Sequence, residues 1–455
     1  MNNILEQIVC QKKSDLISLK KKHSLEFLQS HISPSTASFY SAFKKDKTHF
    51  ILECKQASPS KGIINTNFNP TLIAQTYNHY ATAISVLTDT PYFKGSFDDL
   101  KKVRQASHLP LLCKDFFIDP YQIYLARYYG ADAILLILSI LNDQQYIHLK
   151  DIAESLSMGV LTEVSNIAEA QRAKTLRAPM VGINNRNLKD FSTNINKTAQ
   201  LAPLLSDDQL IISESGISTN SQVRKISPIA NGFLIGGSLM QENDLDLACR
   251  KLIYGEHKVC GVRDLETIKT LEECGAYYIG FNFVHGSPRY LSVEQAKELS
   301  AKTTLPIVGI FCNQPLAAIQ NIVDSLSLNS VQLHGDETLE YIQALQNLLP
   351  KEVGIWKAVT SKEAPHYQQP YIKRLVLDSK IAGQFGGTGE VFNWDELTGL
   401  KKEKILLAGG IGEKNAAAAI AVGCIGLDLN SQLESSPGNK SKEKILKTFA
   451  IIRNY

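Results

Sequence analysis

Two short apolar runs that end in small residues occur at matching places in the two halves of the chain. The first half ends with residues 213–217 (SESGI) and 234–238 (LIGGS), and the second with 407–411 (LAGGI) and 427–431 (LDLNS). In a (β/α)8 barrel, the loops after the seventh and eighth strands bind phosphate through backbone N–H groups. We therefore predict an α/β protein made of two tandem (β/α)8 TIM barrels, each with a phosphate site.

Short apolar runs alternate with helix-like segments along most of the chain, which is typical of a parallel sheet. Residues 1 to about 48 show helical spacing of leucine and isoleucine among lysines. After them the first half is predicted to form eight strands, at HFILEC, ISVLTD, PLLCKD, AILLIL, GVLTEV, MVGINN, QLIISE and GFLIGG. The second half is predicted to form eight more, at HKVCGV, YYIGFNFV, LPIVGIF, SVQLHG, VGIWKAV, RLVLDS, KILLAGG and CIGLDL. A chain of 455 residues suits two barrels better than one. We place the domains at 1–256 and 257–455, because the second series of strands begins at HKVCGV.

Composition excludes several other classes of protein. A formal net charge of +3 is too small to indicate a nucleic-acid partner, and no apolar run approaches the ~20 residues of a membrane helix. The first residues carry acidic and polar side chains within their apolar pattern, unlike a signal peptide. Eight cysteines without a CxxC motif or a ligand cluster favour neither disulfides nor a metal site. The cysteine pattern therefore indicates a reducing cytoplasm. From the two predicted phosphate sites we expect small sugar-phosphate substrates, and we also expect a monomer.

Charged residues gather at the predicted strand ends of the first half, where a barrel keeps its active site. They are Glu53, Lys55, Lys114, Glu163, Asn184 and Glu214, the asparagine being the one uncharged member. Carboxylates and lysines around one mouth shift each other's pKa and can divide acid from base roles. Any one of them could instead belong to an ion-pair network that holds the barrel mouth, but the whole set beside a phosphate site favours catalysis.

The second half places Cys260 after its first strand and Asp378 after its sixth. Arg289 follows the second strand and His334 ends the fourth, and a glycine-rich segment at 383–394 could fold over a ligand. Taken alone, Cys260 could be a small core residue and His334 a structural histidine. Their positions at strand ends favour a site.

The first half resembles indole-3-glycerol-phosphate synthase in the motifs ILECKQASPSKG, LTDTPYFKGSFDDL, LCKDFFIDPYQIYLARYYGADA, GINNRNL, ISESGI and LIGGSLM. That family closes the indole ring of carboxyphenylaminodeoxyribulose phosphate with loss of carbon dioxide and water, without a cofactor or metal. The resemblance implies that Lys114 is the main general acid and that Glu163 assists loss of the hydroxyl group. It implies that Lys55 pairs with the substrate carboxylate and can itself donate a proton. Orientation of the intermediate would fall to Glu53, Asn184 and Glu214, and the phosphate and ribulose end to Ser58, Ser215, Gly216, Gly236 and Gly237, the last of which is Ser in many relatives.

The second half resembles phosphoribosylanthranilate isomerase in KVCGV, GFNFVHGSPRYL, VQLHGDE, LVLDSKIAGQFGGTG, LAGGI and GLDLNS. That family rearranges an aminoaldose to an aminoketose. The resemblance implies that Asp378 is the acid that opens the sugar ring and that Cys260 is the base at C2, its pKa lowered by a nearby cation. Arg289 would contact the anthranilate, His334 would lie near the sugar, and Gly409, Gly410, Asn430 and Ser431 would hold the phosphate. The segment SSPGNKSKEK departs from the family's GxKD pattern, and we interpret it as a surface helix cap.

The combined resemblance implies a fused enzyme of tryptophan biosynthesis in which the second barrel makes the substrate of the first. We expect the intermediate to diffuse freely between the sites. One alternative is a chain in which one barrel is catalytic and the other is a ligand-binding or docking module. Another is an unrelated pair of sugar-phosphate isomerases or epimerases, which would leave Lys55 and Lys114 unexplained.

Overall fold

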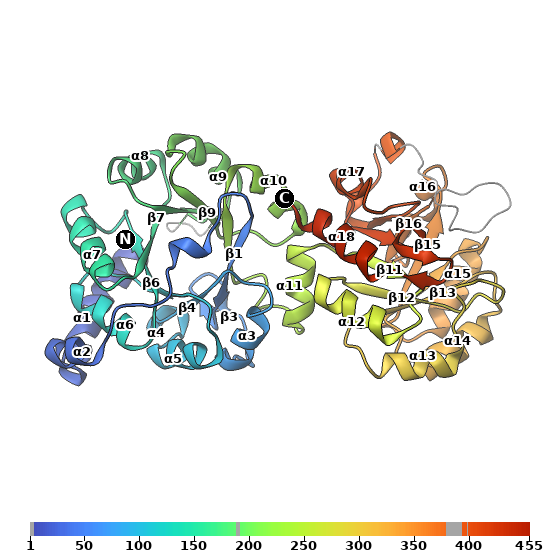
Figure 1. Ribbon diagram of the computed structural model, residues 1–455, viewed down its shortest axis with the longest axis horizontal. Coiled ribbons are helices and arrows are strands. Elements are labelled where there is room, and N and C mark those ends of the chain that lie inside the picture. Colours follow the sequence, from blue (N-terminus) through green and yellow to red (C-terminus); the bar gives the residue numbers. More distant parts are fainter. Residues whose placement is uncertain (1–3, 188–191, 379–393, 398) are drawn as a thin grey trace. The chain divides into compact units, whose positions relative to one another are not determined.

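The computed structural model describes residues 4–187, 192–378, 394–397 and 399–455. Two compact units are present, residues 1–249 with 455, and residues 250–454. Each contains one closed barrel of parallel strands, with helices around the outside (Figure 1). The prediction of two tandem (β/α)8 barrels is therefore confirmed, and every strand predicted from the sequence overlaps an observed one.

The first barrel closes by pairing its first strand with its second and with its last. Its strands are β1 (His49–Cys54), β4 (Ala83–Leu87), β5 (Leu111–Lys114), β6 (Ala133–Ile137), β7 (Gly159–Val164), β8 (Met180–Asn184), β9 (Leu210–Glu214) and β10 (Gly232–Ile235). A short hairpin of β2 (Ala57–Ser58) and β3 (Gly62–Ile63) follows β1. This barrel's helices are α1 (Ile4–Lys22), α2 (Leu25–His31), α3 (Pro70–Tyr77), α4 (Thr90–Phe93), α5 (Phe97–Ala106), α6 (Pro120–Tyr128), α7 (Asp143–Ser155), α8 (Ile167–Thr175), α9 (Asn196–Leu201) and α10 (Asn220–Ile226). The boundary between the two units falls within α11 (Leu245–Ile253).

The second barrel closes in the same way, from its first strand to its eighth. Its strands are β11 (Lys258–Cys260), β12 (Tyr278–Asn282), β13 (Ile307–Phe311), β14 (Ser330–Leu333), β15 (Gly354–Val359), β16 (Arg374–Leu377), β17 (Ile405–Leu407) and β18 (Gly426–Leu429). Its helices are α12 (Leu265–Cys274), α13 (Val293–Ser300), α14 (Leu316–Ser325), α15 (Leu339–Leu348), α16 (Ala364–Tyr367), α17 (Ala416–Ala421) and α18 (Lys442–Arg453). Strands β19 (Glu434–Ser436) and β20 (Asn439–Lys440) form a hairpin before α18.

Side-chain polarity along the strands follows the layers of the barrel. On β11, Val259 packs in the apolar layer between strands and helices, while Lys258 and Cys260 face the barrel interior with the alternation that a strand imposes. Apolar side chains fill part of that interior, where Trp356 is fully buried with its ring 4.9 Å from that of Tyr278. Burial of this kind stabilises the barrel and leaves the strand ends for polar side chains.

Helix starts follow the sequence signals closely. Asn69, Asp119 and Ser292 each cap the first turn of a helix, accepting a hydrogen bond from a backbone N–H, and a proline follows the first two. Such caps satisfy N–H groups that the helix itself leaves without a partner. Among the described residues, no helix is both long enough and apolar enough to cross a membrane.

Candidate active sites

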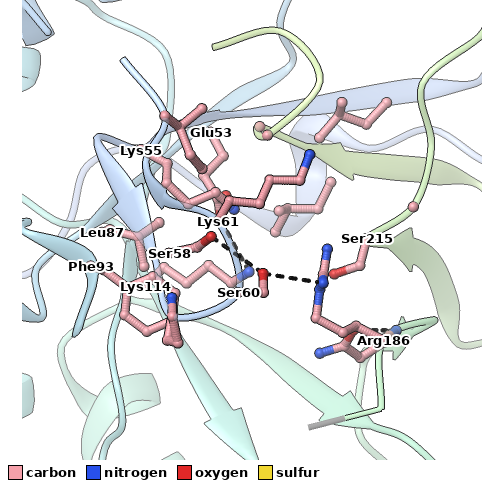
Figure 2. A pocket seen from close by; sticks show the side chains of 18 of the residues that line it. Glu53, Lys55, Ser58, Ser60, Lys61, Leu87, Phe93, Lys114, Arg186 and Ser215 are labelled. Atoms are coloured by element: carbon pink, nitrogen blue, oxygen red, sulfur yellow. Dashed lines mark hydrogen bonds and ion pairs between the residues drawn. The ribbon is translucent and has the colours of Figure 1, made fainter. Parts of the chain in front are cut away.

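The strand ends of the first barrel surround a cavity of about 440 Å³. The six polar residues predicted there come from β1, β5, β7, β8, β9 and the segment after β1. Figure 2 shows Glu53, Lys55 and Lys114 around this pocket, with Ser58 and Ser215 nearby. All of the predicted residues of this half line the cavity except Glu214, which lies beneath it and is fully buried.

Two lysines share the carboxylate of Glu53. Lys114 Nζ lies 3.1 Å from Glu53 Oε2 and 3.5 Å from Glu214 Oε2, and Lys55 Nζ pairs with Glu53 Oε1. Burial alone would raise the pKa of Glu53, but Lys114 and Lys55 outweigh it and hold that pKa at about 2. Glu53 is therefore a fixed anion that positions both ammonium groups.

The pKa values of the other two carboxyl groups, Glu163 and Glu214, are shifted upward instead. Burial raises the pKa of Glu214 to about 8, against the opposing charge of Lys114, and burial likewise raises the pKa of Glu163. Asn184 Nδ2 donates to Glu163 Oε1 at 3.1 Å and so holds that carboxyl group toward the mouth. One mouth therefore holds a fixed anion and two carboxyl groups whose pKa is raised by burial.

The two lysines also differ from each other. Burial lowers the pKa of Lys55 against the attraction of Glu53, whereas Glu53 and Glu214 overcome burial and raise the pKa of Lys114. Lys114 is thus a permanent cation, and Lys55 is the lysine that releases a proton more readily.

Glycines make room for these carboxylates. A Cβ at Gly182 would lie 1.8 Å from Glu214 Oε1, and one at Gly236 would lie 2.5 Å from Glu53 Oε1. The sequence indicated Gly236 for phosphate contact, but its part in seating Glu53 was missed, as was Gly182 altogether. Their signal is weak, because a glycine inside a strand also marks a bulge or a bend.

The predicted phosphate residues lie on the loops after β9 and β10. Ser215 and Gly216 have φ values of 65° and 81°, and a Cβ at Gly216 would lie 2.3 Å from Thr193 Cγ2, so this turn requires glycine. Ser238 Oγ donates to Ile217 O at 2.9 Å and joins the two loops. Around Gly237 there is no described atom within 4 Å of the Cβ position, so the serine of many relatives would fit there.

Several residues of this cavity were not predicted from the sequence. Arg186 donates to Ser60 Oγ at 3.4 Å across the mouth (Figure 2), and Lys61 also lines the cavity. Arg186 lies within the quoted motif GINNRNL, which was the available signal. Helix α1 contributes Ile4, Leu5 and Ile8. The spacing of Leu5 and Ile8 predicted a helix but not the cavity wall that it forms.

A buried lysine on α1 forms ion pairs with two aspartates beside this mouth. Lys12 Nζ lies 2.9 Å from Asp89 Oδ2 and 2.8 Å from Asp115 Oδ1, with the lysine side chain 6% exposed. Asp89 caps α4 by accepting from Tyr92 N, and Asp115 follows Lys114 directly and accepts from Thr88 Oγ1 at 2.7 Å. One ammonium group therefore connects α1 with the segments that follow β4 and β5.

We expect Lys12→Met to lower the free energy of unfolding of the first barrel by about 3–5 kcal/mol, because it leaves two buried carboxylates without their cation. Urea denaturation followed by circular dichroism measures this change. Lys20→Met is the matched control on the same helix, since the Lys20–Asp119 pair is 46% and 30% exposed, and it should cost less than about 1 kcal/mol. Equal effects of the two substitutions would contradict the role of Lys12.

The strand ends of the second barrel surround a smaller cavity of about 120 Å³. Every residue predicted for this half lines it, namely Cys260, Arg289, His334, Asp378, Gly409, Gly410, Asn430 and Ser431. Gly409 and Gly410 have φ values of 88° and 57°, which the loop after β17 requires. The predicted glycine-rich segment at 383–394 lies almost entirely outside the described residues.

His334 Nε2 faces Asp378 Oδ2 at 3.6 Å, and both residues line the cavity together with Cys260. Burial raises the pKa of Cys260, although the cations Lys258, Lys440 and Arg289 oppose this effect. The resemblance to the isomerase family implied a lowered pKa for this thiol. In the protein without substrate the direction is reversed, because desolvation outweighs the surrounding cations.

Arg289 and Lys440 meet the same carboxylate at the edge of this cavity. Arg289 Nε and Nη2 each lie 2.8 Å from an oxygen of Glu434, and Lys440 Nζ lies 2.9 Å from Glu434 Oε1. Lys440 Nζ also donates to Asn430 Oδ1 at 2.9 Å. The interpretation of SSPGNKSKEK as a surface helix cap is therefore incomplete: Ser441 does cap α18, but Lys440 is buried within the β19–β20 hairpin and supports the site.

Neither cavity offers a metal site within the part of the chain that the structure describes, where no three His, Cys, Asp or Glu side chains are placed to share an ion. Both mouths combine anionic and cationic side chains with glycine-rich loops at matching strand ends. This arrangement can transfer protons to and from a bound sugar phosphate.

Known proteins match both halves of the chain. A family model of indole-3-glycerol phosphate synthase matches residues 5–252, and a model of N-(5'-phosphoribosyl)anthranilate isomerase matches 257–450. The tryptophan biosynthesis protein TrpCF of Salmonella typhi is 48% identical over 100% of both chains, and that of Vibrio cholerae is 47% identical over 100% of this chain and 97% of its own. Among solved structures, a phosphoribosylanthranilate isomerase from Thermotoga maritima is 29% identical and covers 44% of this chain and 98% of its own, with a TM-score of 0.38.

Proposed function

This chain belongs to the indole-3-glycerol phosphate synthase family over residues 5–252 and to the N-(5'-phosphoribosyl)anthranilate isomerase family over 257–450, and we propose here which residues perform the two reactions. It is a bifunctional enzyme of tryptophan biosynthesis with both activities on one chain. Its substrates are small phosphorylated intermediates. The C-terminal barrel isomerises phosphoribosylanthranilate to an aminoketose, which the N-terminal barrel converts to indole-3-glycerol phosphate.

In the N-terminal barrel, ring closure requires a cation beside the ribulose carbonyl oxygen as that oxygen gains negative charge. We assign this role to Lys114, because Glu53 and Glu214 hold its ammonium group in the mouth and keep it charged. A cation placed in advance in a buried site stabilises a forming oxyanion more strongly than one in water. Lys55 pairs with the substrate carboxylate until carbon dioxide leaves, and its lowered pKa supports a part as proton donor.

Loss of water from the closed ring requires an acid for the departing hydroxyl group. Glu163 suits this step, because burial raises its pKa and Asn184 holds one of its oxygens. Glu214 and Glu53 orient the lysines, and we assign the phosphate to the loops that carry Ser215, Gly216, Gly236 and Gly237, with Ser58 on the opposite side of the mouth. The convergence of these groups on one cavity is the observation that supports this assignment.

In the C-terminal barrel, an acid protonates the ring oxygen so that the C1–O bond breaks, and a base then removes the proton at C2. We assign the first role to Asp378 and the second to the thiolate of Cys260, which line one cavity from the ends of β16 and β11, three strands apart around the barrel. Opening of the ring leaves a cationic nitrogen on the substrate, whose charge would lower the pKa of the neighbouring thiol. Arg289 contacts the anthranilate, His334 lies near the sugar, and Gly409, Gly410, Asn430 and Ser431 hold the phosphate.

We further propose that the protein acts as a cytoplasmic monomer without a nucleic-acid partner, and that its barrels separate between residues 256 and 257. Each barrel has its own closed sheet and apolar core, which supports independent folding.

A progress curve from phosphoribosylanthranilate tests the assignment of one reaction to each barrel. With the full chain, the aminoketose should rise and then fall as indole-3-glycerol phosphate forms. Residues 257–455 alone should stop at the aminoketose, and residues 1–256 alone should act only on supplied aminoketose. Each fragment should also unfold cooperatively in urea. Fragments that are both insoluble and inactive would show that the boundary is misplaced or that the barrels depend on each other.

A further inference from the structure

A buried lysine lies in the barrel interior beneath the isomerase cavity, and none of the roles above uses it. Lys258 Nζ donates to Asp428 Oδ2 and to Gln332 Oε1, each at 2.7 Å, and its side chain is fully buried. Lys258 stands two residues before Cys260 on β11, so both side chains face the interior. It does not line the cavity itself and so would not touch the substrate.

Gly280 on the neighbouring strand β12 allows the two side chains to lie one above the other. A Cβ at Gly280 would lie 3.0 Å from Lys258 Cε and 3.0 Å from Cys260 Cα. Gly280 pairs with Cys260 across the two strands, and a larger residue there would press against both. The glycine therefore keeps the ammonium group and the thiol on the same inner face with little between them.

The ammonium of Lys258 remains charged at this depth. Burial alone would lower its pKa, but Asp428 reverses that effect and raises the pKa above the ordinary value. The charged groups that act on the Cys260 thiol are Lys258, Asp428, Lys440 and Arg289. Lys258 has the largest effect of the three cations, and Lys440 and Arg289 are both paired with Glu434.

The same lysine determines how Gln332 is oriented. An ammonium group can only donate, so the amide of Gln332 must present its oxygen to Lys258 and its NH2 group to the other side. On that side Gln332 Nε2 lies 3.2 Å from His334 Nδ1, which must then accept the hydrogen bond. A neutral His334 therefore carries its proton on Nε2, the atom that faces Asp378 Oδ2 at 3.6 Å.

We propose that Lys258 is a positioning residue of the isomerase with two effects. It stabilises the Cys260 thiolate from the barrel interior, and through Gln332 it orients His334 so that the Nε2–H group points toward Asp378. The proposal rests on the assignment of Cys260 and Asp378 as base and acid. A single buried cation then prepares both proton-transfer groups, which stand on different strands of the barrel.

The first test is the pH dependence of Cys260 alkylation by iodoacetamide in the full-length protein, with the modified peptide quantified by mass spectrometry. In Lys258→Met the profile should move to higher pH, and the rate at a fixed pH below the midpoint should fall roughly tenfold, the usual scale for loss of a close opposite charge. Lys357→Met is the matched control, because Lys357 is likewise buried and paired with a carboxylate, Glu337, in the same barrel but is not among the main groups that shift the pKa of Cys260. An unshifted profile in Lys258→Met, or an equal shift in Lys357→Met, would overturn the proposal.

A double variant guards against failure of Lys258→Met to fold. Lys258→Met with Asp428→Leu removes the ion pair as a whole, a change that buried pairs often tolerate. The alkylation profile should still move to higher pH, by a smaller amount, because the stronger cation and the weaker anion are lost together. A profile that moves to lower pH would refute the effect of Lys258 on the thiol.

Gln332→Met tests the effect of Lys258 on His334 separately from its effect on Cys260. It keeps the Lys258–Asp428 pair, so the alkylation rate of Cys260 should stay within about twofold of the wild type. The isomerase kcat should fall about tenfold with little change in KM, because His334 loses the partner that selects its protonated nitrogen. An unchanged kcat would contradict the proposed effect on His334 through Gln332. If Lys258→Met shifts the alkylation profile while isomerase turnover stays at the wild-type level, the lysine acts as proposed and the assignment of Cys260 as base is the part that fails.

Discussion

Replacing Lys114 by alanine should abolish formation of indole-3-glycerol phosphate and cause the aminoketose to accumulate. The ammonium of Lys114 is 3.1 Å from Glu53 and 3.5 Å from Glu214, and alanine leaves those buried carboxyl groups without it. The ribulose carbonyl would then meet no fixed cation as it gains charge. Loss of such a group lowers turnover by about 10²–10⁴-fold.

The measurement is the rate of indole formation from supplied aminoketose, followed beside the isomerase rate of the same preparation. The isomerase is an internal control for folding and concentration, and it should be unchanged. Lys102→Ala, at an exposed position on α5, is the control for loss of a lysine as such. If Lys114→Ala still closes the indole ring within about tenfold of the wild-type rate, the assignment of Lys114 as the cation that stabilises the forming oxyanion is wrong, because loss of such a group costs about 10²-fold or more.

Cys260→Ser and Asp378→Asn should each lower isomerase turnover by about 10²-fold or more, the usual scale for general acid–base groups. Serine keeps the size of the side chain but does not ionise near neutral pH, and asparagine keeps the shape of aspartate without its acid. Because the two residues line the second cavity from different strands and have different assigned roles, each loss removes a different proton transfer.

Neither substitution should change the synthase rate measured with supplied aminoketose. Alkylation of the wild-type protein should slow the isomerase alone, and bound product should protect it. Cys274→Ser, on α12 outside the cavity, is the matched control for the loss of a thiol. Full isomerase activity in Cys260→Ser would return Cys260 to the alternative of a small core residue, and the base would have to be sought elsewhere around the cavity.

The architecture could be predicted from the sequence because barrel strands are short, apolar and regularly separated by helices. The same regularity placed Cys260 and Asp378 correctly at strand ends, and a strand end in a barrel leads to the mouth. Periodicity shows which side of a strand a residue faces, but not which side chain it meets. The joint contacts of Lys12 with Asp89 and Asp115 could therefore not be predicted, since the three residues come from separate segments.

Ionisation was harder still to predict, because it depends on the balance between burial and charge. Glu53 and Glu214 both lie in the last two residues of apolar strands, yet one pKa lies at about 2 and the other at about 8. The difference arises from which lysines reach each carboxylate. Gly182 and Gly280 were missed for a related reason: what they contribute is the space that a neighbouring charged side chain occupies.

The buried Lys258–Asp428 pair lies where another protein of this architecture could place a layer of apolar side chains. Exchange of a buried ion pair for well-packed apolar residues is often neutral or stabilising, so this barrel has a simple route to greater heat resistance. That route would remove the cation beneath Cys260. Selection for thermostability alone would then be expected to yield a more heat-resistant barrel with lower isomerase activity. Selection for tryptophan synthesis should oppose this exchange.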